Sequence, residues 1–368
     1  MQLAHLATAG FRNLAPMDLE LSNLFHVFHG SNGHGKTNVL ESIYFLSNLK
    51  PLRGRKTKDL IQWGETQATV SAACEDQGLT RRFRADITQS GRTCSIDGKK
   101  VHKMAEYFGG IRCIAFTPAD ARIVSDEPAL RRSWVDRAAF TKSPIHLEHV
   151  KQYERLRAQK SAVLKSDRPD SSVLDVLDHQ LSVCGANLIV RRRQLIEELS
   201  PHIRALHAKI VGLNEEITIE YESQLSATKT EEIQAELASL YRTHRSNELR
   251  RRSVLYGPHR DDVGFVLGER PARVFGSRGQ VRSIVLALKL AELLAARARG
   301  QHPVFLLDDL SSELDQHRTK QLVDTLEELG TQVFITTTDP DFLRTLPPEK
   351  TRFILVSKGT LSVGGSGT

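Results

Sequence analysis

Residues Gly30-Ser31-Asn32-Gly33-His34-Gly35-Lys36-Thr37 follow the pattern Gly-x-x-x-x-Gly-Lys-Thr. The apolar run 24–28 before them is typical of a buried strand, and 38–46 after them has apolar residues at helical spacing. Strand, glycine-rich loop and helix are the context of a phosphate-binding loop, whose backbone N–H groups cradle phosphates at the positive end of a helix. We expect all eight residues to bind a nucleotide, with Lys36 neutralising β/γ-phosphate charge and the Thr37 hydroxyl binding Mg²⁺.

A phosphate-binding loop needs an acidic strand end that holds the metal. The stretch Pro303-Val304-Phe305-Leu306-Leu307-Asp308-Asp309 fits, because four apolar residues precede two aspartates. We expect Asp308 to hold Mg²⁺, directly or through water, and Asp309 to polarise the attacking water, so that Lys36, Asp308 and Asp309 form the catalytic set. Because 272 positions separate Lys36 from Asp308, small GTPase-type folds are excluded and a large insertion in the core is expected.

Three further stretches resemble parts of ABC-type ATPases. Ser277-Arg278-Gly279-Gln280 precedes an expected helix and resembles the Ser-Gly-Gly-Gln signature, with Arg278 in place of one glycine. Ser311–Asp315 lies where those ATPases have their D-loop, and Thr338 lies where they have a switch histidine. In that class the signature acts in trans, so that ATP is held between the phosphate loop of one subunit and the signature of another. The resemblance therefore implies an ATP-dependent homodimer.

Composition limits the class of protein and its partners. The chain has 368 residues, of which 40% are hydrophobic and 26% charged, with a formal charge of +7. No apolar run approaches the roughly 18 residues of a membrane span, and the N-terminus lacks the layout of a signal peptide. The four cysteines are scattered, which argues against zinc sites and disulfides. We expect a soluble cytoplasmic protein without a membrane partner, and the basic charge favours a polyanion.

The expected fold class is α/β, an ABC/SMC-type P-loop ATPase head with an inserted, mostly helical second domain. A 3–4 alternation of apolar residues over 174–195 fits either a projecting antiparallel hairpin or an ordinary packed helical subdomain. Ser200-Pro201 indicates a helix start or kink, and Asp97-Gly98 suits a tight hairpin turn. The expected domains are 1–118 (head, with the phosphate loop), 119–246 (helical insertion) and 247–368 (head, with signature, acidic strand and D-loop).

Positive charge clusters in several places. The segment Lys50–Lys58 holds five Lys or Arg residues and no acidic residue, and its glycine and proline indicate an exposed loop. Lys and Arg contacts to phosphates give affinity without sequence preference, and the sequence shows no helix-turn-helix, zinc finger or aromatic stacking platform, so base-specific reading is not expected. We expect non-sequence-specific DNA contacts from Arg53, Arg55, Lys56, Lys58 and Arg260.

Over essentially its whole length the chain resembles the RecF family of SMC/ABC-class ATPases. Besides the motifs above, the resemblance depends on Phe116–Asp120, Pro128, Arg131-Arg132, Trp134–Asp136 and Tyr256-Gly257-Pro258-His259-Arg260-Asp261-Asp262. The last stretch is the most specific, because general ABC ATPases lack it. The resemblance implies a weak, DNA-dependent ATPase that dimerises on ATP and recognises gapped DNA or junctions of duplex and single strand. It also implies a role in DNA replication, recombinational repair and the SOS response, in which RecA is loaded with the help of RecO and RecR.

Two departures from the ABC pattern indicate slow hydrolysis. Asp309 replaces the glutamate of many ABC ATPases and is one methylene shorter, and Thr338 replaces the switch histidine. Alternatives are an ABC-type transport ATPase subunit, an ATP-gated scaffold without a DNA role, and an SMC-like end-processing factor. The wide separation of the motifs argues against the first, and the short insertion argues against the last, whose arms are far longer.

Overall fold

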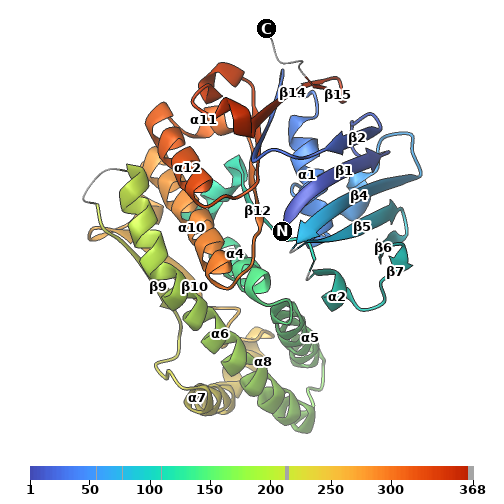
Figure 1. Cartoon of the computed structure of the whole chain (residues 1–368). Helices are drawn as coiled ribbons and strands as arrows, with labels where there is room; N and C mark the ends of the chain where they lie inside the picture. The colour runs from blue at the N-terminus through green and yellow to red at the C-terminus, as the bar shows by residue number, and fades with distance from the viewer. Residues whose placement is uncertain (55, 77, 109, 212–214, 364–368) are drawn as a thin grey trace. The chain divides into compact units, whose positions relative to one another are not determined.

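The chain folds into two compact units in a computed structural model that describes residues 1–54, 56–76, 78–108, 110–211 and 215–363 (Figure 1). Unit 1 comprises Met1–Ala121, Leu206–Leu213 and Arg282–Thr368, and unit 2 comprises Arg122–Ala205 and Asn214–Val281. Residues 247–281, which we expected in the C-terminal part of the head, fall in unit 2. The reason is that β10 (Asp262–Leu267) pairs antiparallel with β9 (Ile217–Glu222) of the insertion.

Unit 1 contains a six-stranded, mostly parallel sheet in the order β15-β14-β3-β13-β12-β8. Only the pair β14–β15 is antiparallel. The central strands are continuous apolar runs because helices or another sheet cover both faces. The strands are β3 (Phe25–His29), β8 (Cys113–Phe116), β12 (Val304–Leu307), β13 (Val333–Thr337), β14 (Thr351–Ser357) and β15 (Thr360–Val363).

A second, antiparallel sheet of unit 1 has the order β2-β1-β4-β5-β6-β7. Buried and exposed residues alternate along β4 and the end of β5, as the sequence pattern predicts. The expected turn at Asp97-Gly98 joins β6 to β7, with φ of 50° and 78°. The strands are β1 (Gln2–Ala9), β2 (Met17–Glu20), β4 (Gln67–Asp76), β5 (Leu79–Thr88), β6 (Gly91–Ile96) and β7 (Lys99–Lys100).

The helix that follows the phosphate loop, α1 (Lys36–Asn48), lies between the two sheets and contacts β13 and β8 on one side and β4 and β5 on the other (Figure 1). On the opposite face of the parallel sheet lie α10 (Arg278–Ala298) and α12 (Gln316–Glu328). The phosphate loop is thus held in the middle of unit 1. Shorter elements are η1 (Thr57–Leu60), α2 (Met104–Phe108), η2 (Pro118–Ala121), α11 (Leu310–Glu313), η3 (Pro340–Leu343) and η4 (Pro348–Lys350).

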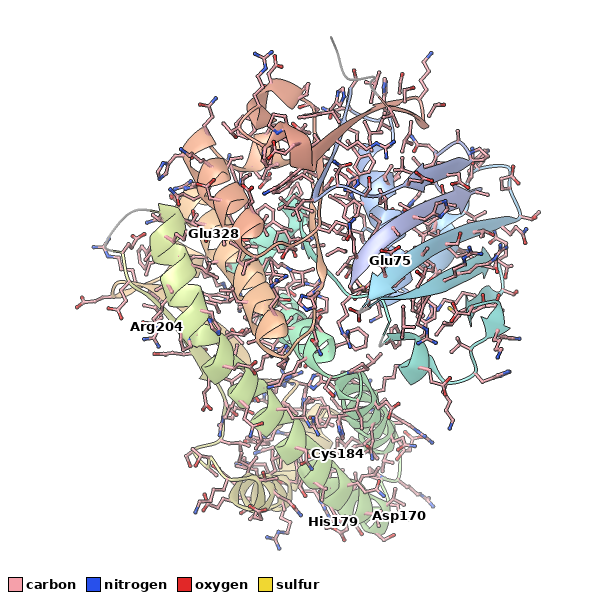
Figure 2. All side chains as sticks on the ribbon, viewed as in Figure 1. Glu75, Asp170, His179, Cys184, Arg204 and Glu328 are labelled. Carbon is pink, nitrogen blue, oxygen red and sulfur yellow. The ribbon has the colours of Figure 1, made fainter. Side chains whose placement is uncertain are left out.

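Unit 2 is mostly helical, with a three-stranded sheet in the order β11-β10-β9. Its longest helix, α6 (Ser171–Val211), belongs to unit 2 up to Ala205 and to unit 1 from Leu206. It begins after Asp170, whose carboxylate accepts a hydrogen bond from the Ser172 N–H (2.8 Å; Figure 2). The other elements are α3 (Arg122–Ser125), α4 (Pro128–Lys142), α5 (His146–Lys165), α7 (Thr230–Thr243), α8 (Arg245–Arg251), α9 (Ala272–Phe275) and β11 (Arg270–Pro271).

The helix start predicted at Ser200-Pro201 is wrong, because α6 runs through both residues, and the alternative of a kink there stays a prediction. Pro201 removes the hydrogen bond to the Glu197 carbonyl, but both residues are exposed and water can satisfy that carbonyl. On the opposite face Leu199 and Ile203 are buried and hold the helix to the core. By length and composition α6 is the one described helix that could cross a membrane, and half of its most apolar window is buried within the protein.

The apolar seam of α6 packs as the core of a helical subdomain. Leu174, Leu181 and Leu188 join one buried cluster with Leu237 and Tyr241 of α7. The same core encloses Lys160 of α5, which forms ion pairs with Asp178 (2.5 Å) and Glu248 (2.6 Å). Of the two alternatives for the insertion, this packing favours the packed subdomain.

Residues 257–262, which the sequence analysis singled out, form hydrogen bonds and an ion pair within unit 2. The Pro258 carbonyl accepts a hydrogen bond from Arg192 (2.7 Å), and Asp262 forms an ion pair with buried Arg131 (2.6 Å). His259 Nδ1 lies 2.7 Å from the Tyr153 hydroxyl and its Nε2 lies 3.1 Å from the Val254 carbonyl. These partners fit a neutral ring that accepts at Nδ1 and donates at Nε2. Burial lowers the pKa of His259 to about 4.

The depressed pKa of His259 predicts a pH-dependent stability of unit 2. The unfolded chain binds this proton below pH 6.5 and the folded chain only below about 4, so stability present above pH 6.5 is lost as the pH falls toward 4. We expect the free energy of unfolding to fall by about 3 kcal/mol more between pH 7 and pH 4 in the parent than in His259→Gln. Fluorescence of buried Trp134, in a Trp63→Phe background, follows unit 2. Parallel pH curves for the two chains would contradict the prediction.

Candidate nucleotide site

The phosphate loop connects β3 to α1 and requires glycine at two points. Gly30 has φ 141° and an added Cβ would lie 2.3 Å from the Val356 carbonyl oxygen. Gly35 has φ 105°, and its Cβ would lie 2.9 Å from Asn13 Oδ1. Asn13 also donates to the Gly33 carbonyl (3.0 Å), so the loop that follows β1 fixes the phosphate loop from outside.

Lys36 points back into the loop. Its Nζ donates hydrogen bonds to the carbonyls of Gly30 (2.6 Å) and Ser31 (3.0 Å). Burial lowers the pKa of Lys36, and the charges of Asp309 and Asp308 oppose that shift. The cation is thus held where the loop folds around it, facing the acidic strand end.

Asp308 joins the acidic strand to the phosphate loop. It is 3% exposed, and its Oδ1 accepts hydrogen bonds from the hydroxyls of Thr37 (2.6 Å) and Thr336 (2.8 Å). Its Oδ2 faces the Arg53 guanidinium at 3.2 Å. The structure therefore brings together Thr37 and Asp308, which are 271 positions apart, as the sequence analysis expected.

Asp309 has an unusual backbone. With φ 56° it lies in the left-handed region, which costs a non-glycine residue about 1–3 kcal/mol and is concentrated at functional sites. Its N–H donates to Thr336 Oγ1 (2.8 Å). Asp309 is half-buried whereas Asp308 is buried, so the two carboxylates of the pair meet different surroundings.

Two threonines and a glutamate near the acidic pair were not predicted as site residues. Thr336 contacts both aspartates, and Thr337 Oγ1 lies 2.9 Å from Ser311 Oγ and so ties β13 to the D-loop segment. Glu313 is buried, pairs with Arg282 at 2.8 Å, and has a pKa raised by burial. The signal available in the sequence was position, since Glu313 lies within the predicted D-loop segment Ser311–Asp315 and the two threonines directly precede Thr338 at the switch position.

The remaining predicted residues occupy varied positions. Asp315 caps α12 by accepting from the Arg318 N–H (2.9 Å), and Thr338 is exposed after β13. In the signature, Ser277 and Gln280 form a capping box, in which each side chain bonds the other's backbone N–H (2.7 and 3.2 Å). Because Ser277 Oγ accepts, its own proton stays available for a further acceptor. Ser277–Gln280 belong to unit 2, whereas the phosphate loop and the acidic pair belong to unit 1.

The predicted DNA-contacting residues are divided between the units. Arg53, Lys56 and Lys58 are exposed in unit 1, whereas Arg55 lies outside the described residues. Arg260 is exposed in unit 2 and reaches the Val254 carbonyl at 3.4 Å.

The loop that carries Arg53 is held by a clamp around Arg12. Arg12 forms an ion pair with Glu41 of α1 (2.8 Å) and donates to the carbonyls of Asp59 (2.8 Å) and Arg53 (3.3 Å). Glu41 also accepts the Arg53 N–H (3.0 Å). This clamp fixes the loop beside the nucleotide site.

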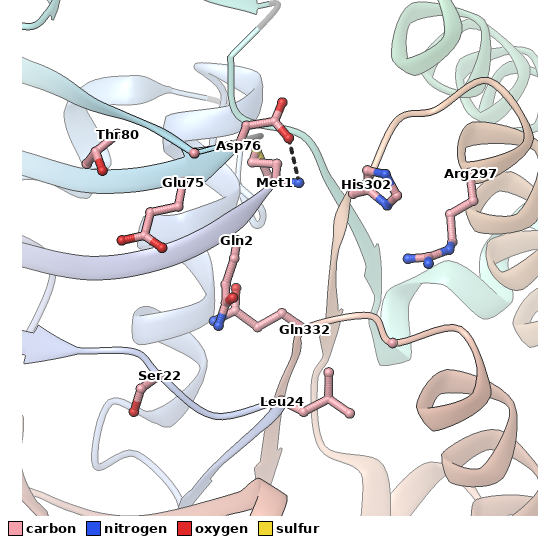
Figure 3. Close-up of a pocket in the computed structure, with 12 residues that line it drawn as sticks. Met1, Gln2, Ser22, Leu24, Glu75, Asp76, Thr80, Arg297, His302 and Gln332 are labelled. Carbon is pink, nitrogen blue, oxygen red and sulfur yellow. Dashed lines mark ion pairs between the residues drawn. The ribbon is translucent and has the colours of Figure 1, made fainter.

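Another hollow of unit 1, of about 730 Å³, lies away from these groups (Figure 3). Its lining includes Leu24, His302 and Gln332, which lie just before β3, β12 and β13. It therefore opens at the edge of the parallel sheet opposite the phosphate loop. The N-terminal ammonium and Asp76 form an ion pair beside it (2.9 Å). None of the predicted site residues that the structure describes lines it.

Comparisons with known proteins agree with this fold and site. The family described as RecF/RecN/SMC N terminal domain matches residues 2–360. The DNA replication and repair protein RecF of Geobacter metallireducens is 38% identical over 365 residues, covering 98% of this chain and 100% of that protein. The protein of the same name from Anaeromyxobacter dehalogenans is 38% identical over 370 residues, covering 98% and 99%.

Solved structures extend the comparison. A structure of the recombination mediator protein RecF-ATPrS in the RecFOR pathway matches with a TM-score of 0.90 at 26% identity, covering 99% of this chain and 98% of that one. An SMC head bound to the C-winged helix domain of ScpA matches with a TM-score of 0.58 at 14% identity and shares the fold. Fold and phosphate loop thus define an ATPase head of the SMC class, which confirms the expected fold class. Within this class, the chain belongs to the RecF family.

The contacts of Thr336 predict that one hydroxyl supports the acidic pair. Thr336→Val keeps the shape but leaves Asp308 Oδ1 with one donor fewer and the Asp309 N–H without its acceptor. We expect a loss of about 1–3 kcal/mol in the free energy of unfolding. Thr336→Ser keeps the hydroxyl and is the matched control. Equal urea midpoints for the valine and serine variants would show that the hydroxyl does not support the pair.

Proposed function

We propose that this chain is an ATP-binding, slowly hydrolysing DNA-binding protein of replication and recombinational repair. Its ATP-bound homodimer recognises gapped DNA or junctions of duplex and single strand, without sequence preference, and helps load RecA together with RecO and RecR in the cytoplasm. The observation that carries the ATP site is the 2.6 Å contact between Thr37 and Asp308. Relatives named as DNA replication and repair proteins, and the RecF-ATPrS structure of the RecFOR pathway, support the role.

The site fits a magnesium nucleotide. Two adjacent ligands in an Mg²⁺ octahedron lie about 2.9 Å apart, given metal–oxygen distances of about 2.05 Å. Thr37 Oγ1 and Asp308 Oδ1, at 2.6 Å, are hard oxygen donors at nearly this spacing. When bound, Mg²⁺ would neutralise charge on the β- and γ-phosphates. Thr37 and Asp308 would hold it, while Thr336 keeps Asp308 oriented.

The other residues act on the phosphates and the attacking water. The backbone N–H groups of the phosphate loop and Lys36 bind the phosphate oxygens. To do so, Lys36 gives up its hydrogen bonds to the carbonyls of the loop and donates to phosphate oxygens instead. Asp309, held by its left-handed backbone and by Thr336, orients the water and accepts its proton. Its short side chain and the exposed Thr338 at the switch position fit slow turnover. Hydrolysis therefore acts as a timer for the dimer.

The signature closes the site in trans. In the capping box Ser277 keeps its proton, so it can donate to a γ-phosphate oxygen while α10 remains capped. The N-terminus of α10, a helix of 21 residues, adds partial positive charge there. ATP then joins two subunits, and its hydrolysis releases them.

Lys36→Arg tests the ATP site. The guanidinium keeps the charge, but its planar fork does not fit between carbonyls that Nζ reaches at 2.6 and 3.0 Å. We expect hydrolysis to fall by about 100-fold or more, the scale for losing one transition-state donor, with ATP binding partly retained. Phosphate release and filter binding of ATP measure the two effects. Lys165→Arg, an exposed exchange in unit 2, is the control, and parent-like turnover of Lys36→Arg would remove Lys36 from the mechanism.

ATP-gated dimerisation and DNA binding are tested together with Asp309→Asn, which blocks hydrolysis. With ATP we expect a dimer by light scattering, and binding of gapped duplex at least ten-fold tighter than with ADP or without nucleotide, weakening steeply with salt. Matched duplex and single strands are compared in parallel. A monomer under every condition, or DNA binding indifferent to ATP, would overturn the clamp.

The second variant in this experiment adds Ser277→Asp to Asp309→Asn. Aspartate is as good an N-cap as serine, so α10 stays capped, but its charge repels the γ-phosphate. We expect ATP binding without a dimer. A dimer that survives this change would exclude the signature from the interface.

A further inference from the structure

Trp63 is fully exposed, with a relative exposure of 101%. It occupies the tip of a tight turn closed by the Glu65 N–H and the Gln62 carbonyl (3.0 Å). Gly64 follows with φ 91°, the conformation that the third residue of a type II turn requires. The turn therefore fixes the backbone at Trp63 and leaves the indole exposed to solvent.

The base of this turn is rigid. The Gln62 N–H donates to the Gly10 carbonyl (2.8 Å), and the Arg12 N–H donates to the Leu60 carbonyl (2.8 Å). Between these bonds a β-bridge joins Phe11 to Ile61. The segment after β1 thus holds both the turn and, through Arg12, the basic loop.

The exposure of Trp63 has no structural use within the described residues. The other tryptophan, Trp134, is 0% exposed and packs against Phe265, as is normal for this side chain. The neighbours of Trp63 in the turn are Gln62, Gly64, Glu65 and Thr66, which form no apolar surround. A protein-binding hot spot is normally enclosed by contacts that exclude water, so this setting does not favour a protein partner.

Charge around the turn favours a polyanion. Residues 50–65 carry five Lys or Arg and two acidic residues, a net charge of +3. Lys56 and Lys58 are exposed within seven positions of Trp63, and η1 connects them to the turn. An exposed aromatic ring and exposed cations in one short segment are groups with which proteins bind single-stranded nucleic acid, the ring stacking on a base and the cations contacting phosphates.

We propose that Trp63 is a stacking platform for an unpaired base, and that Lys56 and Lys58 contact the adjoining phosphates. The inference rests on the proposed DNA-binding function and adds a site for the single-stranded part of the substrate. Every base has a π-face, so the site has no sequence preference.

The test compares two oligonucleotides of equal length and charge, oligo(dT) and an abasic strand that keeps the phosphates but lacks bases. With ATP and Mg²⁺, the full-length protein is expected to bind oligo(dT) about ten-fold tighter than the abasic strand, within the range for one base–aromatic stack. We expect Trp63→Ala to bind the two strands with equal affinity. Trp63→Phe keeps an aromatic ring and is expected to keep most of the ten-fold preference. Leu79→Ala, which trims another exposed apolar side chain, is the control and leaves it unchanged.

Fluorescence and salt dependence provide independent readouts. Because Trp134 is buried, quenching on adding oligo(dT) reports Trp63 and is absent with the abasic strand. Trp63→Ala keeps the salt dependence of binding, whereas Lys56→Ala and Lys58→Ala each reduce its slope by about 1.

The outcomes separate the two proposals. If the parent binds gapped DNA but Trp63→Ala binds both strands as the parent does, the stacking site is overturned and the proposed function stands. If Trp63→Ala binds oligo(dT) as the parent does but no longer binds a partner protein, Trp63 is a protein-docking residue. This result would equally overturn the stacking site. If the parent binds no DNA in any nucleotide state, the proposed function and this site fail together.

Discussion

The contact between the Thr37 hydroxyl and the Asp308 carboxylate, at 2.6 Å, is the constraint on which the rest of the structure depends. It joins residues 271 positions apart, so the chain between them must leave the core and return in register. The return is made by β12, whose parallel pairing with both β8 and β13 places Asp308 at the carboxyl edge of the sheet. Since β13 pairs with β3, the phosphate loop reaches the same edge. An insertion is acceptable at any length that preserves this register.

At that edge a few groups have several partners each. Asp308 is shared by Thr37, Thr336 and Arg53, and Thr336 in turn holds the backbone of Asp309. A change in one partner alters the hydrogen bonds left for the others, so the proposed metal site, the proposed water position and the basic loop are coupled through one buried carboxylate. Arg53 is half exposed, and a polyanion that attracted it would free Asp308 Oδ2. In the proposed function, DNA and nucleotide would therefore influence each other through contacts already present.

The parts of this arrangement that follow a local rule could be predicted from the sequence. Gly30 and Gly35 must be glycine because of their backbone angles, and an apolar run ending in Asp308 indicates a strand leading to a site. Thr336 could not be found in this way, because its role depends on β13 lying beside β12, which only tertiary structure reveals. The continuity of α6 through Pro201 was missed for a similar reason. Burial of the apolar residues on the opposite face outweighs the local preference of proline for a helix start.

Tertiary structure also decides how much of the positive charge in the sequence lies on the surface, where DNA could contact it. In unit 2, Arg131, Lys160 and Arg192 are nearly buried and are paired with Asp262, with Asp178 and Glu248, and with Asp136. Breaking such pairs is costly, so they fix the packing of unit 2 and are not available to bind phosphates. The excess of basic residues in the whole chain therefore overstates the positive charge that a polyanion could contact at the surface. The exposed segment that contains Lys56, Lys58 and Trp63 gains importance, because there charge and an aromatic ring both face solvent on a rigid base beside the nucleotide site.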